Sequence, residues 1–246
     1  MSELTGKRAL VTGGSRGIGA AIALTLAEKG ADVALSYERS AERAADVVRA
    51  IEAKGRRGIA IQADSADPEA VKRLVREAVD GLGGLDIVVN NAGIARQGPL
   101  AEIGLADIDA LLDVNVRAAV LVSQAVIPHL GQGGRIVLIG SSLADRVVFG
   151  GVTVYSMTKS AQVALARGLA RELGPRDITV NLVHPGATDT DMNPADADHA
   201  DTLRAMSALG RYGTPEDVAT AVAFLASPAA KQITGTSITV DGGLNI

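Results

Sequence analysis

The stretch Thr12-Gly-Gly-Ser-Arg-Gly-Ile-Gly19 joins two segments with different apolar patterns. Residues 8–12 form a short apolar run that predicts a strand, and residues 18–29 show the spacing of an amphipathic helix. The glycines between them permit positive φ and let a ligand approach the backbone closely. Because the N-terminus of a helix stabilises anions, this strand–turn–helix unit predicts a pyrophosphate site. The alternative is a glycine turn that only packs a strand on a helix.

The same alternation of apolar strands and helices continues along the whole chain. Strands are predicted at residues 8–12, 32–37, 58–62, 85–90, 135–139, 178–183 and 236–240, and helices at 18–29, 41–53, from 67–68 onward, 105–130, 155–173 and 215–226. Strands as apolar as these belong in parallel sheets that are covered on both faces. The sequence therefore predicts one domain over residues 1–246, an α/β, doubly wound (Rossmann) parallel seven-stranded sheet with helices on both faces.

In such a fold, ligands bind beyond the carboxyl ends of the strands. The irregular stretch at residues 186–199 follows the sixth predicted strand, so we expect it to form a lid on the ligand side.

Composition excludes several classes of function. The 246 residues carry a net charge of −4 and only 2% aromatic residues, which argues against nucleic-acid binding. Absence of cysteine excludes disulfides, Cys-ligated metals and a Cys nucleophile, and the three histidines are scattered, so no metal site is expected. There is neither an uninterrupted apolar run of about 20 residues nor a signal-peptide pattern, so the protein is expected to be cytoplasmic and not membrane-bound.

Several motifs occur in the same order as in a known family. Asn90-Asn-Ala-Gly93 follows the fourth predicted strand, Tyr155-Ser-Met-Thr-Lys159 opens a helix, Pro185-Gly186 follows the sixth strand and Asp241-Gly-Gly243 lies near the end. Together with the glycine turn they resemble the short-chain dehydrogenase/reductase family over essentially the whole chain. The resemblance implies an oxidoreductase that interconverts a carbonyl compound and an alcohol by hydride transfer with a nicotinamide cofactor.

Tyr155 and Lys159 are the predicted acid–base pair. Residues four apart lie on the same helix face. A nearby ammonium is expected to lower the pKa of the phenol, which then acts as an acid in reduction and a base in oxidation. By resemblance, Lys159 also binds the nicotinamide ribose.

The carbonyl oxygen needs a second hydrogen-bond donor, for which there are two candidate serines. The register of the fifth strand favours Ser141, whereas the family's commonest interval before Tyr155 favours Ser142. We prefer Ser141, because strand geometry fixes the direction of a side chain. By resemblance, Asn115 completes the catalytic set by holding a water that relays protons to Lys159. Asn115 can also be a buried residue hydrogen-bonded to backbone within a helix, and the two roles are compatible.

The end of the second predicted strand distinguishes NAD from NADP. A carboxylate there would bind the 2′-hydroxyl of NAD, but the residue is Tyr37, followed by Glu38, Arg39 and Ser40. With Arg16 these residues favour a 2′-phosphate and hence NADP (NADPH), although Glu38 opposes this preference. The predicted cofactor site comprises Gly13, Ser15, Arg16, Gly17, Ile18, Gly19, Tyr37, Arg39, Ser40, Asp64, Ser65, Asn91, Gly93, Tyr155, Lys159, Pro185, Gly186 and Thr188.

The substrate class is inferred from what the predicted wall of the site lacks. Residues 147–149 and 94–97 are mostly apolar, and residues 128–134 contain no lysine or arginine. The chain resembles the family's oxoacyl-carrier-protein reductases but lacks, at residues 128–134, the basic patch that they present to an acidic carrier. A small, neutral ketone or aldehyde, or the matching alcohol, is therefore expected.

Two further expectations rest on resemblance. Asp145-Arg146 and Asp189-Thr-Asp-x-Asn-Pro194 are similar to a branch of the family linked to cyclic di-GMP. The alternative function is therefore binding or sequestering a cyclic dinucleotide with weak or no reductase activity. Family members are commonly tetramers that pair through the two long helices and the last strand, so a homotetramer is expected.

Overall fold

A computed structural model describes residues 3–246 of the chain. One sheet contains seven parallel strands in the order β3-β2-β1-β4-β5-β6-β7. The strands are β1 (Arg8–Val11), β2 (Asp32–Tyr37), β3 (Gly58–Gln62), β4 (Leu85–Asn90), β5 (Leu130–Ile139), β6 (Thr179–Pro185) and β7 (Ser237–Val240). Because the order of the strands reverses between β1 and β4, the crevice for a ligand opens at their carboxyl ends. The predicted doubly wound α/β fold is confirmed.

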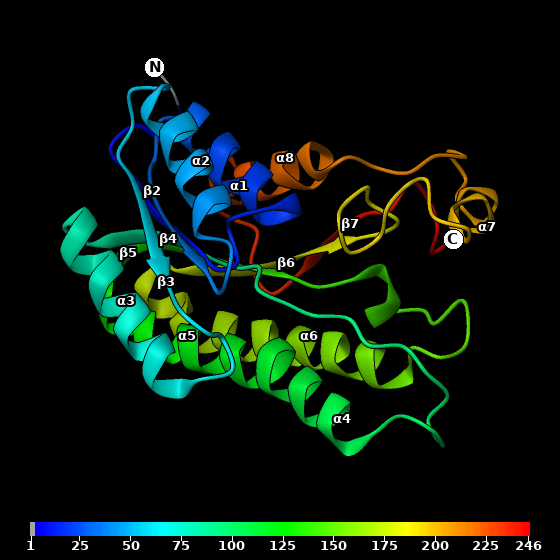
Figure 1. The fold of residues 1–246 in the computed structure, drawn as a ribbon. Helices are drawn as coiled ribbons and strands as arrows, with labels where there is room; N and C mark the ends of the chain where they lie inside the picture. Colours follow the sequence, from blue (N-terminus) through cyan, green and yellow to red (C-terminus); the bar gives the residue numbers. More distant parts are fainter. Residues whose placement is uncertain (1–2) are drawn as a thin grey trace.

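Helices cover both faces of the sheet (Figure 1). One face carries α1 (Gly17–Glu28), α2 (Ala41–Glu52) and α8 (Pro215–Ala226), and the other carries α3 (Pro68–Leu82), α4 (Leu105–Leu112), α5 (Ala118–Val126) and α6 (Thr153–Leu173). Side chains of successive strand residues point to opposite faces of the sheet. Val11 therefore lies in the core under α1 and α8, and Leu10 lies in the core under α3 and α6. A short helix, α7 (Ala200–Met206), follows the predicted lid.

The predicted helix at residues 105–130 is interrupted. After α4, residues Asp113–Arg117 form a π-turn before α5 begins, and Ile127–His129 form a 3-10 turn. Within the π-turn, the Asn115 carbonyl accepts a hydrogen bond from Gln162 Nε2 at 2.7 Å. A side chain of α6 thus supplies a hydrogen bond that a backbone N–H would supply in a regular helix. The spacing of apolar residues does not reveal such a contact. β5 also begins at Leu130 rather than at residue 135.

Among residues 3–246, one helical stretch has the length and composition of a membrane span. Leu105–His129 reaches a mean hydropathy of 1.6 over its most apolar window, of which 39% is buried. Some of its apolar side chains are buried inside the protein: Ala119, Val122 and Val126 belong to the core shared with α3 and α6.

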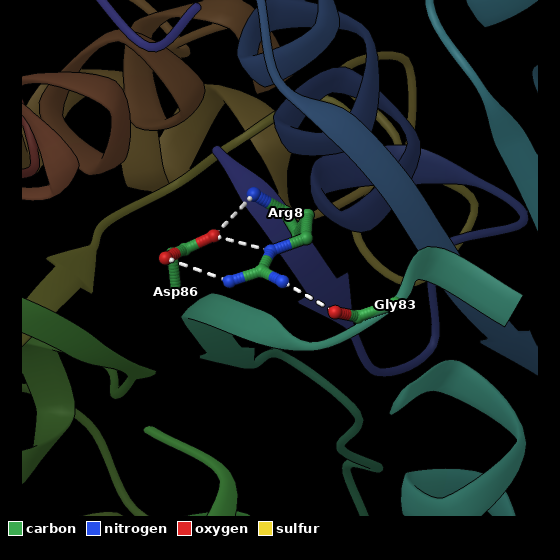
Figure 2. A network of polar contacts seen from close by, with 3 residues as sticks. All are labelled: Arg8, Gly83 and Asp86. Atoms are coloured by element: carbon green, nitrogen blue, oxygen red, sulfur yellow. Dashed lines mark hydrogen bonds and ion pairs between the residues drawn. The ribbon is translucent and has the colours of Figure 1, made fainter. Parts of the chain in front are cut away.

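The amino ends of the two central strands are tied by a polar network (Figure 2). Asp86 Oδ2 in β4 accepts hydrogen bonds from Arg8 N at 2.9 Å and Arg8 Nε at 2.7 Å. Arg8 Nη2 donates to Asp86 Oδ1 at 3.2 Å, and Nη1 donates to the Gly83 carbonyl at 2.5 Å. This network fixes β1 against β4 at the sheet edge opposite the ligand crevice.

Candidate active site

The glycine turn lies between β1 and α1, at the carboxyl ends of the strands, and leaves no room for a side chain at Gly19. Gly13 and Gly17 have φ values of 64° and 51°. A Cβ added at Gly19 would lie 2.2 Å from the Gly13 carbonyl oxygen. No side chain caps the N-terminus of α1, where Arg16 is the N-cap residue. The N–H groups of the first turn of α1 therefore suit a bound pyrophosphate.

Thr12 and Asn91 hold this turn in shape. Thr12 Oγ1 accepts hydrogen bonds from Asn91 N and Ala92 N, both at 3.0 Å. Asn91 Nδ2 donates to the carbonyls of Thr12 at 2.9 Å and Gly13 at 3.1 Å. Asn91 is one of the residues predicted from the sequence to form the cofactor site, and Thr12 is not. In the structure both residues shape the glycine turn.

Two arginines converge on a carboxylate of the lid. Asp191 Oδ2 lies 3.3 Å from Arg16 Nη1 and 2.5 Å from Arg43 Nη1. The hydrogen bond from Arg43 lowers the pKa of Asp191 despite some opposing desolvation, and Arg16 lowers it further. Guanidinium groups from the glycine turn and from the first turn of α2 thus already bind one anionic group at the mouth of the site.

Arg39 does not take part in this cluster. Its side chain is 88% exposed, and its Nε pairs with Glu38 Oε1 at 2.8 Å. Arg43, which is not among the residues predicted from the sequence, belongs to this cluster. Sequence patterns did not identify Arg43, because an arginine in the first turn of a helix looks like an ordinary surface charge. Tyr37 ends β2 and is half-buried, as is Ser40, the N-cap residue of α2.

Asp64 and Ser65 follow β3, next to β2 in the sheet. Asp64 is exposed, and its Oδ1 accepts a hydrogen bond from Ala66 N at 2.8 Å. One carboxylate oxygen of Asp64 therefore stabilises the loop after β3. The predicted cofactor-site residues at this end of the sheet follow three neighbouring strands, β1, β2 and β3.

The lid at residues 186–199 begins where β6 ends at Pro185 and contains neither a helix nor a strand. Gly186 packs against Asp241, near the C-terminus, since a Cβ added at Gly186 would lie 2.5 Å from Asp241 Cβ. Thr188 is buried and donates to the Gly186 carbonyl at 3.2 Å. Thr190 Cγ2 would lie 3.4 Å from a Cβ on Gly17. The lid therefore rests on the glycine turn.

Tyr155 and Lys159 occupy the first two turns of α6. The Lys159 ammonium lies 5.9 Å from the centre of the Tyr155 ring and donates to the Ile139 carbonyl at 2.9 Å. A Cβ on Gly93 would lie 3.3 Å from both Lys159 Nζ and Asn115 Oδ1. Gly93 therefore lets the loop after β4 pass between these two groups.

The expected effect of Lys159 on Tyr155 is not found in the structure. Burial raises the pKa of Tyr155, and a hydrogen bond with Ser141 only partly offsets this. Burial also lowers the pKa of Lys159 to about 8. The prediction of a lowered pKa for the phenol is therefore wrong. Removal of water outweighs the opposite effects here, and Lys159 is directed to the Ile139 carbonyl.

The two candidate serines have different surroundings. The Ser141 side chain hydrogen-bonds to Tyr155, and its Oγ also accepts from Leu143 N at 3.2 Å. Ser142 begins a 3-10 turn and is buried, and its carbonyl accepts from Asn245 Nδ2 at 2.6 Å. The structure therefore places Ser141 beside Tyr155, as the strand register predicts.

Asn115 is completely buried. Its Oδ1 accepts from Ile94 N at 2.9 Å, while Nδ2 donates to the Ile94 carbonyl at 3.0 Å and to Thr158 Oγ1 at 3.1 Å. These contacts match the alternative that the sequence left open, an Asn hydrogen-bonded to backbone. They join the loop after β4 to α6, close to Lys159.

The chain matches known proteins over nearly its whole length. The family model described as enoyl-(acyl carrier protein) reductase matches residues 13–245. The chain belongs to the short-chain dehydrogenase/reductase family. A solved short-chain dehydrogenase from Burkholderia cenocepacia J2315, in complex with NADP, is 60% identical, with a TM-score of 0.98 and coverage of 99% of this chain and 100% of that chain.

Two curated relatives of this short-chain dehydrogenase/reductase differ in what their names state. The cyclic-di-GMP-binding biofilm dispersal mediator protein of Escherichia coli (strain K12) is 43% identical over 242 residues, which are 98% of each chain. The 3-oxoacyl-acyl-carrier-protein reductase of Staphylococcus aureus (strain Mu50) is 42% identical over 240 residues, 97% of this chain and 98% of the relative. The protein is thus an oxidoreductase by family, and the comparisons leave its substrate open.

The arrangement fits the dinucleotide on which the family's chemistry depends. The glycine turn has no room for side chains at Gly19, and the anion-binding arginines lie beside it at the mouth of the crevice. Lys159 lies next to Gly93, and Tyr155 lies one turn before Lys159 in α6. A short-chain dehydrogenase/reductase needs phosphate-binding groups at one end and a proton donor at the other, and this chain offers candidates for both.

Proposed function

We propose that the protein is an NADP(H)-dependent oxidoreductase that interconverts a small ketone or aldehyde and the corresponding alcohol. The observation that carries this proposal is the Tyr155 hydroxyl, hydrogen-bonded to Ser141 and accompanied by Lys159 in one cluster. Ser141 and Lys159 are buried, and Tyr155 is half-buried. The cluster lies at the same edge of the sheet as the glycine turn, where a cofactor and a carbonyl group can meet.

The chemistry supplied by a bound NADP(H) is hydride transfer at the nicotinamide ring. Tyr155 donates its phenolic proton to the carbonyl oxygen in reduction and removes the alcohol proton in oxidation. Ser141 donates a hydrogen bond to the same oxygen while negative charge develops on it. Lys159 holds a positive charge close to the phenol. The proton lost from Tyr155 would be replaced through Lys159 and a water held by Asn115.

The cofactor preference is assigned to the residues around β2 and the glycine turn. Arg16, Tyr37, Arg39 and Ser40 are the residues assigned to a 2′-phosphate, and the complex of the Burkholderia relative with NADP supports the choice of cofactor. Arg43 joins the group because it already shares an anion with Arg16. Glu38 pairs with Arg39, so its carboxylate is partly neutralised.

The substrate is assigned to the small, neutral class. Val147, Phe149 and Met192 are exposed apolar side chains in the loop after β5 and in the lid. Such a wall suits an uncharged carbonyl compound better than a phosphorylated one. A homotetrameric state and a cytoplasmic location stay predictions from the sequence.

The test compares the wild type with Tyr155→Phe in NADPH oxidation against a panel of ketones and aldehydes. Removing the hydroxyl is expected to reduce kcat by about 10²- to 10⁴-fold, because it removes the general acid. Fluorescence titration should show NADPH binding within about 2-fold of the wild type, since the ring remains. Wild-type turnover by Tyr155→Phe would contradict the proposal, and so would a wild type that turns over no carbonyl in the panel.

A second candidate function is binding of cyclic di-GMP. The name of the Escherichia coli relative favours it, as do the two arginines that hold a lid carboxylate. Calorimetric titration with cyclic di-GMP, with and without NADPH, tests this candidate. Binding without any carbonyl turnover would favour the sequestering function, and absence of binding would exclude it.

A further inference from the structure

His184 lies at the carboxyl end of β6 and is completely buried against the segment that carries Ser141. Its Nδ1 accepts a hydrogen bond from Ser141 N at 3.1 Å. The ring occupies the space above Gly140, where a Cβ would lie 2.2 Å from Nδ1. Glycine at position 140 therefore gives the imidazole room to reach the Ser141 backbone.

This hydrogen bond fixes the tautomer of the ring. Because Nδ1 accepts, the proton of the neutral imidazole is on Nε2. Nε2 is buried and has no hydrogen-bond partner within residues 3–246, and the carboxylate of Asp145 lies 3.9 Å away. Asp145 follows the 3-10 turn that begins at Ser142.

The surroundings keep the ring neutral. Burial lowers the pKa of His184, Asp145 opposes this by raising it, and Lys159 lowers it further. Thr239, the register partner of His184 in β7, carries no charge. A neutral ring keeps Nδ1 available as an acceptor for Ser141 N.

We infer that His184 is a positioning residue, which holds the backbone of Ser141 so that the Ser141 hydroxyl faces Tyr155. Ser141 stands just after β5, beyond the last regular pair of the β5–β6 ladder, Ile139 with Val183. The hydrogen bond from Ser141 N to the His184 ring thus takes the place of a backbone hydrogen bond between β5 and β6. The inference rests on the proposed function, in which Ser141 orients the carbonyl oxygen.

The size of the expected effect follows from geometry. Ser141 contacts Tyr155 through its side chain and His184 through its main chain. Loss of the main-chain anchor leaves the hydroxyl free to move, and a displacement of about 1 Å at a catalytic group costs about 10²-fold in rate. Cofactor binding should be preserved, because the glycine turn and the arginine cluster lie elsewhere.

Two variants distinguish the effect of the hydrogen-bond acceptor at position 184 from the effect of the volume of the ring. His184→Asn keeps a hydrogen-bond acceptor at nearly the same distance from the backbone, whereas His184→Leu fills the space without one. We expect kcat to fall by about 10- to 100-fold in His184→Leu and to stay within about 3-fold of the wild type in His184→Asn, with NADPH affinity changed by less than about 2-fold in both. Equal kcat in the two variants, whether high or low, would overturn the inference.

A measurement on the unsubstituted protein does not depend on turnover or on a variant that folds. The chain has only three histidines. ¹⁵N spectra of histidine-labelled protein, with His184→Asn for assignment, report which ring nitrogen carries the proton. We expect an unprotonated Nδ1 and a protonated Nε2 at neutral pH. A proton on Nδ1 would overturn the inference.

The outcomes also distinguish this inference from the proposed function. If Tyr155→Phe retains turnover, the proposed function fails while the tautomer of His184 still reports on its bond to Ser141. If Tyr155→Phe is inactive but His184→Leu is fully active, the proposed function stands and the positioning role is excluded.

Discussion

Arg43 Nη1 in α2 and Asp191 Oδ2 in the lid lie 2.5 Å apart, although 148 positions separate them in the sequence. Arg16 shares the same carboxylate oxygen. The Asp191 carboxylate of the lid therefore binds the same two arginines that we assign to the 2′-phosphate of NADP. Phosphate and carboxylate compete for the same guanidinium groups, so the lid contact and cofactor binding are coupled.

Asp191→Asn should tighten NADPH binding. The substitution removes the competing charge, and because the ion pairs are exposed the gain is expected to be about 2- to 5-fold in Kd. NADH affinity should change less, because NADH lacks the phosphate. Asp196→Asn is the matched control, since it removes the same charge from the lid at an exposed position. Fluorescence titrations measure both; equal changes in the two variants would exclude competition at the arginine cluster.

Arg43→Gln should weaken NADPH binding by about 3- to 10-fold and leave NADH binding nearly unchanged, because only the phosphate loses a charged partner. Arg49→Gln on the same helix is the control, since Arg49 pairs with Asp46 in an exposed contact. The ratio of the two dissociation constants is the readout. Arg43 has no part in cofactor selection if both cofactors are weakened equally.

Gly19→Ala should disrupt the glycine turn. The new Cβ would lie 2.2 Å from the Gly13 carbonyl oxygen and 2.5 Å from Asn91 Nδ2. We expect a loss of about 1–3 kcal/mol in stability and of most NADPH affinity. Gly131→Ala serves as the control, because a Cβ there meets nothing within 4 Å. Urea unfolding and NADPH titration measure the two effects, and normal cofactor binding by Gly19→Ala would argue against a phosphate site at the turn.

Lys159 should make stability depend on pH in alkaline solution. Its pKa in the folded protein is about 8, below its ordinary value of 10.5. Between these values the unfolded chain binds more protons, so stability rises with pH in this window. From pH 7 to 10 the wild type should gain about 2 kcal/mol relative to Lys159→Met, as measured by urea unfolding without cofactor. A constant difference between the two proteins would show that the Lys159 pKa is unshifted.

Asp86→Ala should destabilise the fold without affecting the site. Burial raises the pKa of Asp86, but the hydrogen bonds from Arg8 lower it more, and the net shift is downward. The contribution of Asp86 is thus present above its unfolded pKa and lost as the pH falls through the folded value. We expect a loss of about 1–3 kcal/mol at pH 7 that shrinks below about pH 4.

Asp46→Ala is the control for Asp86→Ala, because it breaks only an exposed pair with Arg49 and should change stability by less than about 0.5 kcal/mol. NADPH affinity should be unchanged in both variants, since the Arg8–Asp86 network lies at the amino edge of the sheet. A large loss of cofactor affinity in Asp86→Ala would contradict this separation of the two edges.

Local sequence determined the elements and their order. Alternating apolar periods predicted all seven strands, and Asp67 and Pro68 begin α3 as predicted, with the Asp67 side chain accepting from Glu69 N at 2.9 Å. The motif spacing also predicted the positions of the glycine turn and of Tyr155 and Lys159. These features follow from short-range chemistry, such as φ preferences, helix capping and the alternation of apolar residues, which neighbouring residues encode.

Only the tertiary structure decided which distant groups meet. The sequence predicted Arg39 in the 2′-phosphate site but gave no sign that Arg39 pairs with Glu38 or that Arg43 reaches the lid. The sequence also expected Lys159 to lower the pKa of Tyr155, whereas burial raises it. Both outcomes depend on side-chain direction and on how much water the fold removes, and neither quantity is contained in residue spacing. His184 is the clearest case, because its bond to Ser141 exists only where β5 and β6 pair.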